Sequence, residues 1–402
     1  MNTGKLNRKV YVASAVRTPI GRLAGGLAEV PNDDLTVTVI RGVLERAQTK
    51  GEQVEEVIMG NVISAGPFIN IARVGLLKAG LPESVPGYTV NRVCASGLEA
   101  VNQAAVLIGS GYRDIVLAGG VENLTRSPYI LEKTSSPYQR GARTLMESFG
   151  GPRSAPVSIY GELTMGDTAE NVAEKYAVSR EDQDRFALQS HERAVRAMDD
   201  GLFQEEIVPV LVPRRKGEPV RVDTDEHPRR GVTMEDLGKL KPAFRENGSV
   251  TAGNSSGIND GAAALLIMSE EKVKELGVQP LGRIVHFASG GVDPRIMGMG
   301  PVVAIRRLLS ETGLSIGDID LFEVNEAFAS QALACIRELG LPMDRTNVNG
   351  GAIALGHPLG MTGARLAGTI LYELRRRKKR YGIVSLCIGG GQGLATLVEA
   401  VY

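Results

Sequence analysis

Apolar residues along the chain fall into short runs that end in glycine-rich turns. Runs such as DIVLAGG (residues 114–120) and GIVSLCIGG (residues 382–390) are rich in β-formers, and helical patterns lie between runs of this kind. Continuous Val, Ile and Leu runs are typical of strands covered on both faces, and their alternation with helices is typical of βαβ units. The pattern therefore predicts an α/β fold with mixed, mostly parallel sheets.

The same order of elements occurs twice along the chain. A helical stretch precedes a strand that ends near Asn61, and a later helical stretch precedes a strand that ends at Asn325. Cys94 follows Asn61 by 33 residues, and His357 follows Asn325 by 32. We infer two similar halves, in which Cys94 and His357 lie on equivalent loops that a local two-fold axis can bring to one cleft. Coincidence between common α/β patterns is the alternative.

Between residues 128 and 250 the pattern becomes irregular, charged and rich in proline, which predicts an inserted domain. Within it we expect a helix with Ser179 as its N-cap and Gly201 just beyond its end. The predicted division is an N-terminal half at residues 1–127, completed by 251–276, the insertion at 128–250, and a C-terminal half at 277–402.

The composition limits the partners of the protein. Lys plus Arg equals Asp plus Glu, at 46 each in 402 residues, so no overall field favours nucleic acid or an anionic membrane as a partner. An anionic ligand must therefore be held locally. Three scattered cysteines, Cys94, Cys335 and Cys387, suit neither a disulfide framework nor a zinc site, and a reducing compartment is expected.

Neither an export signal nor a membrane segment is recognised. The N-terminal stretch MNTGKLNRKV has no apolar core, and no apolar run reaches the roughly 18 residues that a membrane span needs. We expect a cytoplasmic protein, or one of the mitochondrial matrix if a transit peptide has been removed.

Cys94, in NRVCASGLEA, is the first candidate for chemistry. It lies where a strand turns into a helix, and free backbone N–H groups and the helix dipole favour an anion there. We expect a thiolate with a lowered pKa that acts as a nucleophile. The alternative is an inert buried cysteine, because cysteine is among the most buried residue types.

Three further residues are candidates for supporting roles. His357 precedes Pro358, which can begin a helix, and its loop presents an imidazole that can activate a thiol, unless it only caps a turn. Asn325 can orient water or polarise a carbonyl, unless it only forms a turn before a helix beginning near Glu326. Cys387 precedes GGGQG, which suits an oxyanion hole and lacks the Lys-Ser/Thr of a phosphate loop.

Together these pieces resemble the thiolase family, from AVRTPIGR near the N-terminus to the last strand. The matching stretches are NRVCASG around Cys94, TAGNSSGINDGAAA at residues 251–264, EVNEAFA around Asn325, NVNGGAIALGHPLGMTGAR around His357 and CIGGGQG from Cys387. The resemblance implies a five-layered αβαβα fold with two similar halves and an inserted loop domain that covers bound coenzyme A.

The resemblance also implies an activity. The enzyme would join acetyl-CoA to an acyl-CoA by reversible Claisen condensation, or cleave 3-ketoacyl-CoA with CoA, either as an acetyl-CoA acetyltransferase or as a broader 3-ketoacyl-CoA thiolase of fatty acid metabolism. Cys94 would carry the acyl group, His357 would activate it, and Cys387 would be the acid and base at carbon. Asn325 would hold a water that forms one oxyanion hole with His357, and the backbone N–H groups of Cys94 and Gly389 would form the other.

Further implications concern the ligand and the assembly. Neither a metal nor a prosthetic group is implied, whereas a dimer or tetramer of identical subunits is. Thr164 stands where many short-chain members have His, which leaves the acyl chain length open. The cluster Arg214, Arg215, Lys216 either meets CoA phosphates or forms a solvated face. The residues implied to bind CoA are Arg229, Ser256, Met165, Ala327 and Phe328.

Three other classes stay open at this point. A Cys-His-Asn hydrolase would pass the acyl group to water and has no role for Cys387. A ketoacyl-synthase-like enzyme usually has a second histidine and lacks the second cysteine. A non-catalytic CoA- or lipid-binding relative would be expected to have lost one of the four residues, and all four are present. The remaining histidines, His191, His227 and His286, are expected to be structural or surface groups.

Overall fold

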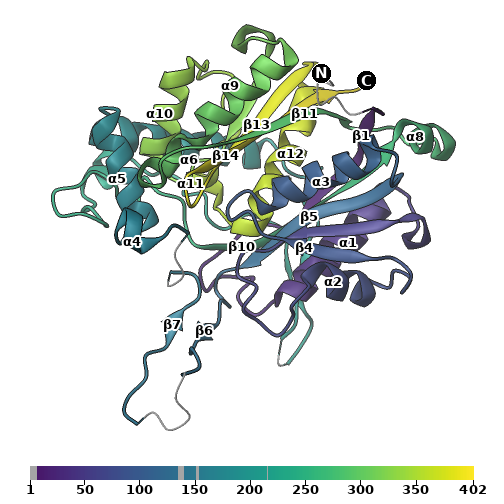
Figure 1. The fold of residues 1–402 in the computed structure, drawn as a ribbon, viewed down its shortest axis with the longest axis horizontal. Coiled ribbons are helices and arrows are strands. Elements are labelled where there is room, and N and C mark those ends of the chain that lie inside the picture. The colour runs from purple at the N-terminus through teal and green to yellow at the C-terminus, as the bar shows by residue number, and fades with distance from the viewer. Residues whose placement is uncertain (1–6, 135–139, 151–153, 215) are drawn as a thin grey trace.

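Among the residues that the structure describes, ten strands form a mixed sheet at the centre of the molecule (Figure 1). The computed structural model describes residues 7–134, 140–150, 154–214 and 216–402. The strands of this sheet are β1 (Val10–Arg17), β2 (Gly21–Arg22), β3 (Glu56–Gly60), β4 (Gly87–Val90), β5 (Ile115–Asn123), β10 (Asn259–Ser269), β11 (Gly282–Gly291), β12 (Leu321–Val324), β13 (Tyr381–Ile388) and β14 (Gln392–Ala400).

Helices cover both faces of the sheet. The α-helices of the two halves are α1 (Asn32–Arg46), α2 (Ile71–Ala79), α3 (Ser96–Gly109), α8 (Glu270–Leu276), α9 (Gly300–Thr312), α10 (Ala329–Leu339), α11 (Ala352–Leu355) and α12 (Leu359–Arg376). The described residues also form the short 3-10 helices η1 (Gly51–Gln53), η2 (Pro294–Met299) and η3 (Ile316–Asp318).

The predicted repeat is confirmed by the order of the strands. Along the sheet, β4, β3, β5, β10 and β1 form one half, and β12, β13, β14 and β11 form the other. A parallel bridge between Phe322 and Thr346 takes the place of β4 in the second half. The halves join where Val10–Val12 of β1 pairs antiparallel with Gly282–Ile284 of β11.

The sheet is mixed, with its parallel ladders towards the outer ends. β3 runs parallel to β4 and β5, and β12 runs parallel to β13. The ladders nearer the middle, which involve β1, β10, β11 and β14, are antiparallel. The antiparallel share is larger than a chain of βαβ units predicts, because β13 and β14 are joined by a tight hairpin and β10 returns to the sheet after the insertion.

The layers follow the predicted five-layered arrangement. One apolar core contains residues of α3 and α12 together with strands of both halves, so these two helices form the central layer. A second core joins α1 and α2 to the outer face of the first half, and a third joins α9 and α10 to the outer face of the second. In β5, Val116 and Ala118 face the central layer while Leu117 faces α1, which explains the uninterrupted apolar run.

The insertion between β5 and β10 contributes strands and helices that pack against both halves, since its Val210 belongs to the second apolar core and its Val172 and Phe186 to the third. A narrow hairpin of β6 and β7 extends away from the body (Figure 1). The helix predicted from the Ser179 cap is confirmed, since Ser179 Oγ accepts from the Asp182 N–H at 3.1 Å and Gly201 follows the helix end at φ +69°. The elements of the insertion are β6 (Tyr129–Ile130), β7 (Met146–Glu147), α4 (Val157–Tyr160), α5 (Met165–Lys175), α6 (Arg180–Asp199), β8 (Val210–Val212), β9 (Val220–Val222) and α7 (Met234–Gly238).

A buried arginine ties the insertion to the first half. Arg17, at the end of β1, donates to Glu206 at 2.6 Å and to both oxygens of Asp225 at 2.7 and 2.9 Å. Burying these charges costs free energy because they lose their water, and the hydrogen bonds between Arg17 and both carboxylates offset that cost. We keep as a proposal the division into halves at residues 1–127 with 251–276 and 277–402 around an insertion at 128–250, which the place of β10 between β1 and β5 supports. Within the described ranges, no helix is long and apolar enough to cross a membrane.

Candidate active site

Cys94 lies between β4 and α3, in the turn that enters the helix. It is 8% exposed, and α3 begins two residues later at Ser96. The start of α3 touches the start of α12, because a Cβ placed on Gly97 would lie 2.5 Å from the carbonyl oxygen of Gly360. Only a residue without a side chain permits this approach. The contact brings together the loops that carry Cys94 and His357.

The pKa of the Cys94 thiol is raised, not lowered. Burial raises it to about 11, although the backbone N–H groups of Gly389 and of Cys94 itself donate to the sulfur and act in the opposite direction. The prediction of a resting thiolate is therefore wrong. The free-energy cost of removing water from a buried thiolate exceeds the stabilisation that two N–H groups and a helix N-terminus provide. The resting residue is therefore a neutral thiol.

His357 lies on the loop between α11 and α12 and is only 4% exposed, so it is packed as well as presented. Its Nδ1 lies 2.7 Å from Oγ1 of Thr362, and the Thr362 hydroxyl donates to the carbonyl of Pro358 at 2.8 Å. A hydroxyl that gives its single proton to a carbonyl can only accept from Nδ1. Nδ1 therefore carries the ring proton, and Nε2 is left unprotonated with a lone pair that can accept.

The pKa of His357 is lowered to about 3, first by burial and then by the positive charge of Arg365. The ring is therefore neutral at physiological pH. A neutral imidazole whose Nε2 lacks a proton can act as a general base towards a thiol.

Asn325 follows β12 and is 1% exposed. Its Nδ2 lies 3.3 Å from Nε2 of His357, and among the described residues its Oδ1 has no hydrogen-bond partner. The amide nitrogen therefore contacts the imidazole, and the amide oxygen is left to accept from a further donor.

The residues after Asn325 are not helical. Helix α10 begins at Ala329 and not near Glu326, so Asn325 is not a turn-former directly before a helix. The buried Glu326 carboxylate accepts from Ser190 Oγ at 2.6 Å and from Asn347 Nδ2 at 2.8 Å. These bonds hold the segment in a non-helical conformation on the way to α10.

Cys387 lies in β13 and is fully buried in a small apolar cluster that includes Ala327 and Phe328. Burial raises its pKa well above the usual value, and charge on Cys94 raises it further. Gly389, two residues beyond Cys387, donates its N–H to the sulfur of Cys94.

A cavity of about 650 Å³ opens onto Cys94 and His357 and is lined mainly by apolar side chains. A volume of this order suits a ligand of drug or cofactor size. Of the residues predicted for the site, the lining includes Cys94, His357, Met165, Ser256, Ala327 and Phe328, and it does not include Asn325, Cys387, Gly389 or Arg229.

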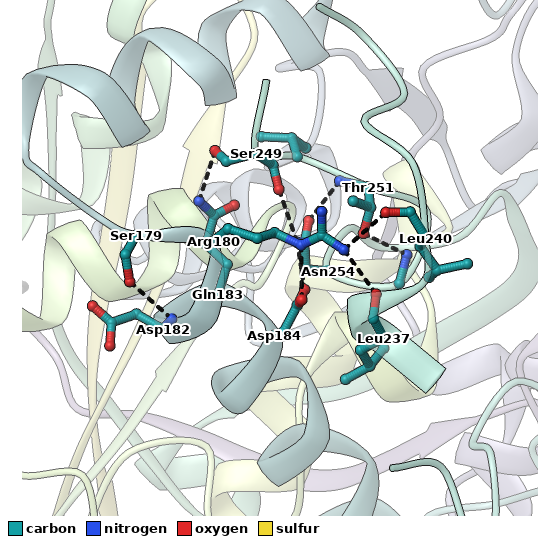
Figure 2. A network of polar contacts seen from close by, with 12 residues as sticks. Ser179, Arg180, Asp182, Gln183, Asp184, Leu237, Leu240, Ser249, Thr251 and Asn254 are labelled. Carbon is teal, nitrogen blue, oxygen red and sulfur yellow. Dashed lines mark hydrogen bonds and ion pairs between the residues drawn. The ribbon is translucent and has the colours of Figure 1, made fainter. Parts of the chain in front are cut away.

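The segment just before Ser256, which includes Ser249, Thr251 and Asn254, is hydrogen-bonded to α6 in a polar network (Figure 2). The Ser256 N–H donates to the carbonyl of Ala327 at 3.0 Å. Just before it, Asn254 donates to Asp184 at 2.9 Å and accepts from the Thr251 N–H at 2.8 Å. The network therefore holds Ser256 against the strand-like segment that carries Ala327.

Arg229 and the three other histidines are not among the residues that line the cavity. The Arg229 side chain is exposed, and its backbone N–H donates to Nδ1 of His191 at 3.2 Å, so its contact with a CoA phosphate stays a prediction. His191 is 3% exposed and stacks with His227 at a ring distance of 6.5 Å, which makes both structural groups of the insertion. His286 pairs with Glu311 at 2.8 Å.

Two polar residues beside the site were not indicated by the sequence pattern. Thr362 sets the tautomer of His357, and its place on the first turn of α12 was the only signal. Glu122, fully buried, raises the pKa of Cys94 through its charge. Of the basic cluster, Arg214 and Lys216 are exposed and Arg215 lies outside the described residues. Within those residues, no group of three or more His, Cys, Asp or Glu side chains is arranged to hold a metal ion.

Two family models match the chain almost from end to end. The model described as "Thiolase, N-terminal domain" matches residues 10–271, and the one described as "Thiolase, C-terminal domain" matches residues 278–400.

Named relatives and solved structures agree with these matches. The acetyl-CoA acetyltransferase of Cupriavidus necator is 49% identical over 97% of this chain and 99% of its own, and that of Pseudomonas aeruginosa is 50% identical over 96% and 98%. The structure of the Bacillus anthracis acetyl-CoA acetyltransferase superposes with a TM-score of 0.94 at 45% identity, covering 98% and 99% of the two chains. Human mitochondrial 3-ketoacyl-CoA thiolase in complex with CoA gives a TM-score of 0.94 at 42% identity, covering 99% of each.

Proposed function

The chain belongs to the thiolase family, and from that premise we propose that it transfers acyl groups between CoA thioesters through a covalent intermediate on Cys94. Thiolases are acyltransferases that form or cleave 3-ketoacyl-CoA. The observation that carries the proposal is the hydrogen-bonded series Thr362–His357–Asn325, which leaves Nε2 of His357 without a proton next to a cavity that also exposes Cys94.

In the first step, the sulfur of Cys94 attacks the acyl carbon of the substrate while its proton passes to Nε2 of His357. A thiol with a pKa of about 11 and an imidazole with a pKa of about 3 do not exchange the proton at rest, so the transfer accompanies formation of the C–S bond. The imidazolium formed is poorly stabilised in a buried site. It therefore readily returns its proton to the sulfur of departing CoA.

Two groups of hydrogen-bond donors would stabilise the oxyanions. The backbone N–H groups of Cys94 and Gly389, which already point at the sulfur, would hold the oxygen of the acyl group on Cys94. On the other side, protonated Nε2 of His357 and a water held by Asn325 would hold the thioester oxygen of the enolate. Separate donor sets let one thioester stay electrophilic while the other becomes nucleophilic.

Cys387 would move the proton at carbon. In condensation the Cys387 thiol passes its proton to neutral Nε2 of His357, and the resulting thiolate removes a proton from the methyl group of acetyl-CoA. The enolate attacks the acyl group on Cys94, whose sulfur is released and takes the proton from Nε2. In cleavage the Cys387 thiol protonates the enolate that leaves. Burial raises the pKa of Cys387 well above its usual value, which makes its thiolate a stronger base and suits it to a weak carbon acid.

CoA would lie in the cavity against Ser256, Met165, Ala327 and Phe328, with Arg229 near its nucleotide end and no prosthetic group required. Acetoacetyl-CoA is the substrate we propose first. Thr164 lines the cavity but also caps α5, accepting from the Asp167 N–H at 3.1 Å, so its presence has a structural reason. Longer 3-ketoacyl chains are a second candidate, favoured by the apolar lining residues Ile63, Leu124 and Leu163.

The assembly and the compartment follow as part of the same proposal. Within the described residues, β4 lies at the end of the sheet and pairs with β3 alone, so one edge is open. Open edges of this kind are normally covered. We therefore propose a dimer or tetramer of identical subunits. The bacterial relatives support a cytoplasmic location as part of the proposal.

A steady-state assay of thiolysis tests the function. Purified protein with free CoA should consume acetoacetyl-CoA and release acetyl-CoA, and the Cys94→Ser variant should lose nearly all of this rate. A series of 3-ketoacyl-CoA substrates of increasing length then separates the two substrate candidates. Release of a free acid from acetoacetyl-CoA without any need for free CoA would contradict the proposal. Full activity in Cys94→Ser would contradict it as well.

A further inference from the structure

Glu122 is a fully buried carboxylate at the end of β5 that the reaction described above does not use. Four N–H groups donate to it. Its Oε1 accepts from Asn61 Nδ2 at 2.8 Å and from the Ile63 N–H at 3.0 Å. Its Oε2 accepts from the N–H groups of Val62 and Gly360, both at 2.9 Å.

This arrangement requires the ionised form. Burial raises the pKa of Glu122 to about 7, and the backbone donors from Val62, Ile63 and Gly360 lower it. Each oxygen already accepts two hydrogen bonds, so all four acceptor positions of a carboxylate are used. A proton added to either oxygen would face a donor instead of an acceptor. The Gly360 N–H that donates to Glu122 lies in the first turn of α12. The N–H groups of a first helical turn have no partner within the helix, and negative charge is favoured there.

The four donors come from the two loops that flank the reacting groups. Val62 and Ile63 line the cavity on the side of the first half. Gly360 lies three residues after His357, in the first turn of α12. The carboxylate therefore joins a loop of one half to the histidine loop of the other.

The same junction is close-packed through glycine. A Cβ on Gly360 would lie 2.4 Å from the carbonyl oxygen of Val121 and 2.7 Å from that of Gly60. Gly97, three residues after Cys94, meets the carbonyl of Gly360 in the same place. A small shift of α12 here would change the separation of Cys94 and His357, because each lies within three residues of the contact.

We propose that Glu122 is a positioning residue of the active site, whose carboxylate holds the His357 loop and the loop at residues 61–63 in the arrangement that lets His357 reach Cys94. This inference rests on the function proposed above. Glu122 does not touch the reacting atoms and acts through the two loops.

The Glu122→Gln variant tests the proposal in the full-length protein. Gln keeps the shape but replaces one acceptor oxygen with an amide group that donates, so two of the four donors lose their acceptor: either Asn61 and Ile63, or Val62 and Gly360. We expect kcat and the single-turnover rate of Cys94 acylation by acetyl-CoA to fall about 10- to 100-fold, as small misplacements of reacting groups do. KM should change much less. The matched control is Glu56→Gln. Glu56 is a buried glutamate at the start of the neighbouring strand β3, pairs with Arg113 and does not line the cavity. This variant should keep the wild-type rate.

A second variant keeps the test decisive if Glu122→Gln fails to fold. Asn61→Leu removes one of the four donors and should slow acylation by a smaller factor, about 3- to 10-fold. Folded Glu122→Gln with wild-type acylation would overturn the inference, as would wild-type acylation in Asn61→Leu where Glu122→Gln does not fold. Failure of the wild-type protein to acylate Cys94 would instead remove the proposed function on which the inference rests.

Discussion

The amide nitrogen of Asn325 lies 3.3 Å from Nε2 of His357, at the end of a strand whose counterpart in the other half ends at Asn61. The two asparagines occupy equivalent places in the duplicated fold but have different partners. Asn61 donates to the carboxylate of Glu122, whereas Asn325 contacts an imidazole that faces the cavity. In the first half the asparagine at this position helps to hold two loops together. In the second half it lies next to the imidazole of the site.

The first prediction concerns Asn325. Asn325→Ala removes the partner of Nε2 and the proposed anchor of the oxyanion water, so condensation and thiolysis should fall about 100- to 1,000-fold in kcat. Acylation of Cys94 should fall much less, because it relies on the donors of Cys94 and Gly389. Steady-state and single-turnover rates separate the two effects. Asn70→Ala, which removes the N-cap of α2 outside the cavity, is the control. If Asn325→Ala slowed acylation of Cys94 as much as condensation, the role assigned to Asn325 would be contradicted.

The second prediction concerns the tautomer of His357. Thr362→Val removes the acceptor of the Nδ1 proton and leaves that N–H buried without a partner, which costs about 1–3 kcal/mol. The ring should then turn or change tautomer, and kcat should fall about 10-fold or more. Thr362→Ser keeps the hydroxyl and should restore most of the rate. A valine variant as active as the serine variant would show that the threonine does not orient the ring.

The third prediction separates the two cysteines. Cys387→Ala should still accept an acyl group on Cys94 but should lose condensation and most thiolysis, since no other group would move the proton at carbon. Mass spectrometry of the protein after incubation with acetyl-CoA and a thiolysis assay measure the two properties. An unimpaired thiolysis rate would exclude Cys387 from the mechanism.

The fourth prediction concerns pH and stability. The folded-state pKa of His357, about 3, lies below its usual value of 6.5, so the unfolded chain takes up the proton first as the pH falls. Stability from the neutral ring is therefore fully present above about pH 6.5 and is lost progressively towards pH 3, by at most about 1.4 kcal/mol per pH unit. Urea unfolding at several pH values should show a weaker acid dependence in His357→Gln. Parallel curves for both proteins would contradict the lowered pKa.

The fifth prediction concerns the attachment of the insertion. Arg17→Met leaves Glu206 and Asp225 buried without their cation, which should lower the free energy of unfolding by about 3–5 kcal/mol. Arg8→Met, which breaks more exposed ion pairs to Asp114 and Glu271, should cost about 0–1 kcal/mol. Denaturant unfolding of the two variants measures both effects. Equal losses in the free energy of unfolding would show that burial does not determine how much an ion pair stabilises this protein.

Much of the fold could be predicted because it depends on local pattern. Strand ends at Asn61 and Asn325, the Ser179 cap and the order of elements all follow from neighbouring residues, and the repeat then indicated which loops meet. The spacing of Cys94 and His357 on equivalent loops was enough to place both on one cavity.

Ionisation states could not be predicted in the same way. The pKa of Cys94 depends on burial by segments from the other half and on Glu122, none of which is near in sequence. A helix N-terminus alone favours a thiolate, and the packing around it reverses that preference. His191 likewise has the polar context of an exposed helix, yet the Arg229 segment of the same insertion covers it.

The most direct test of the account is the mass of the protein after brief incubation with acetoacetyl-CoA or acetyl-CoA, followed by peptide analysis. The account predicts one added acetyl group per chain, on Cys94, and its loss when free CoA is supplied. An acetyl group on Cys335, or no covalent adduct under conditions in which substrate is consumed, would contradict it.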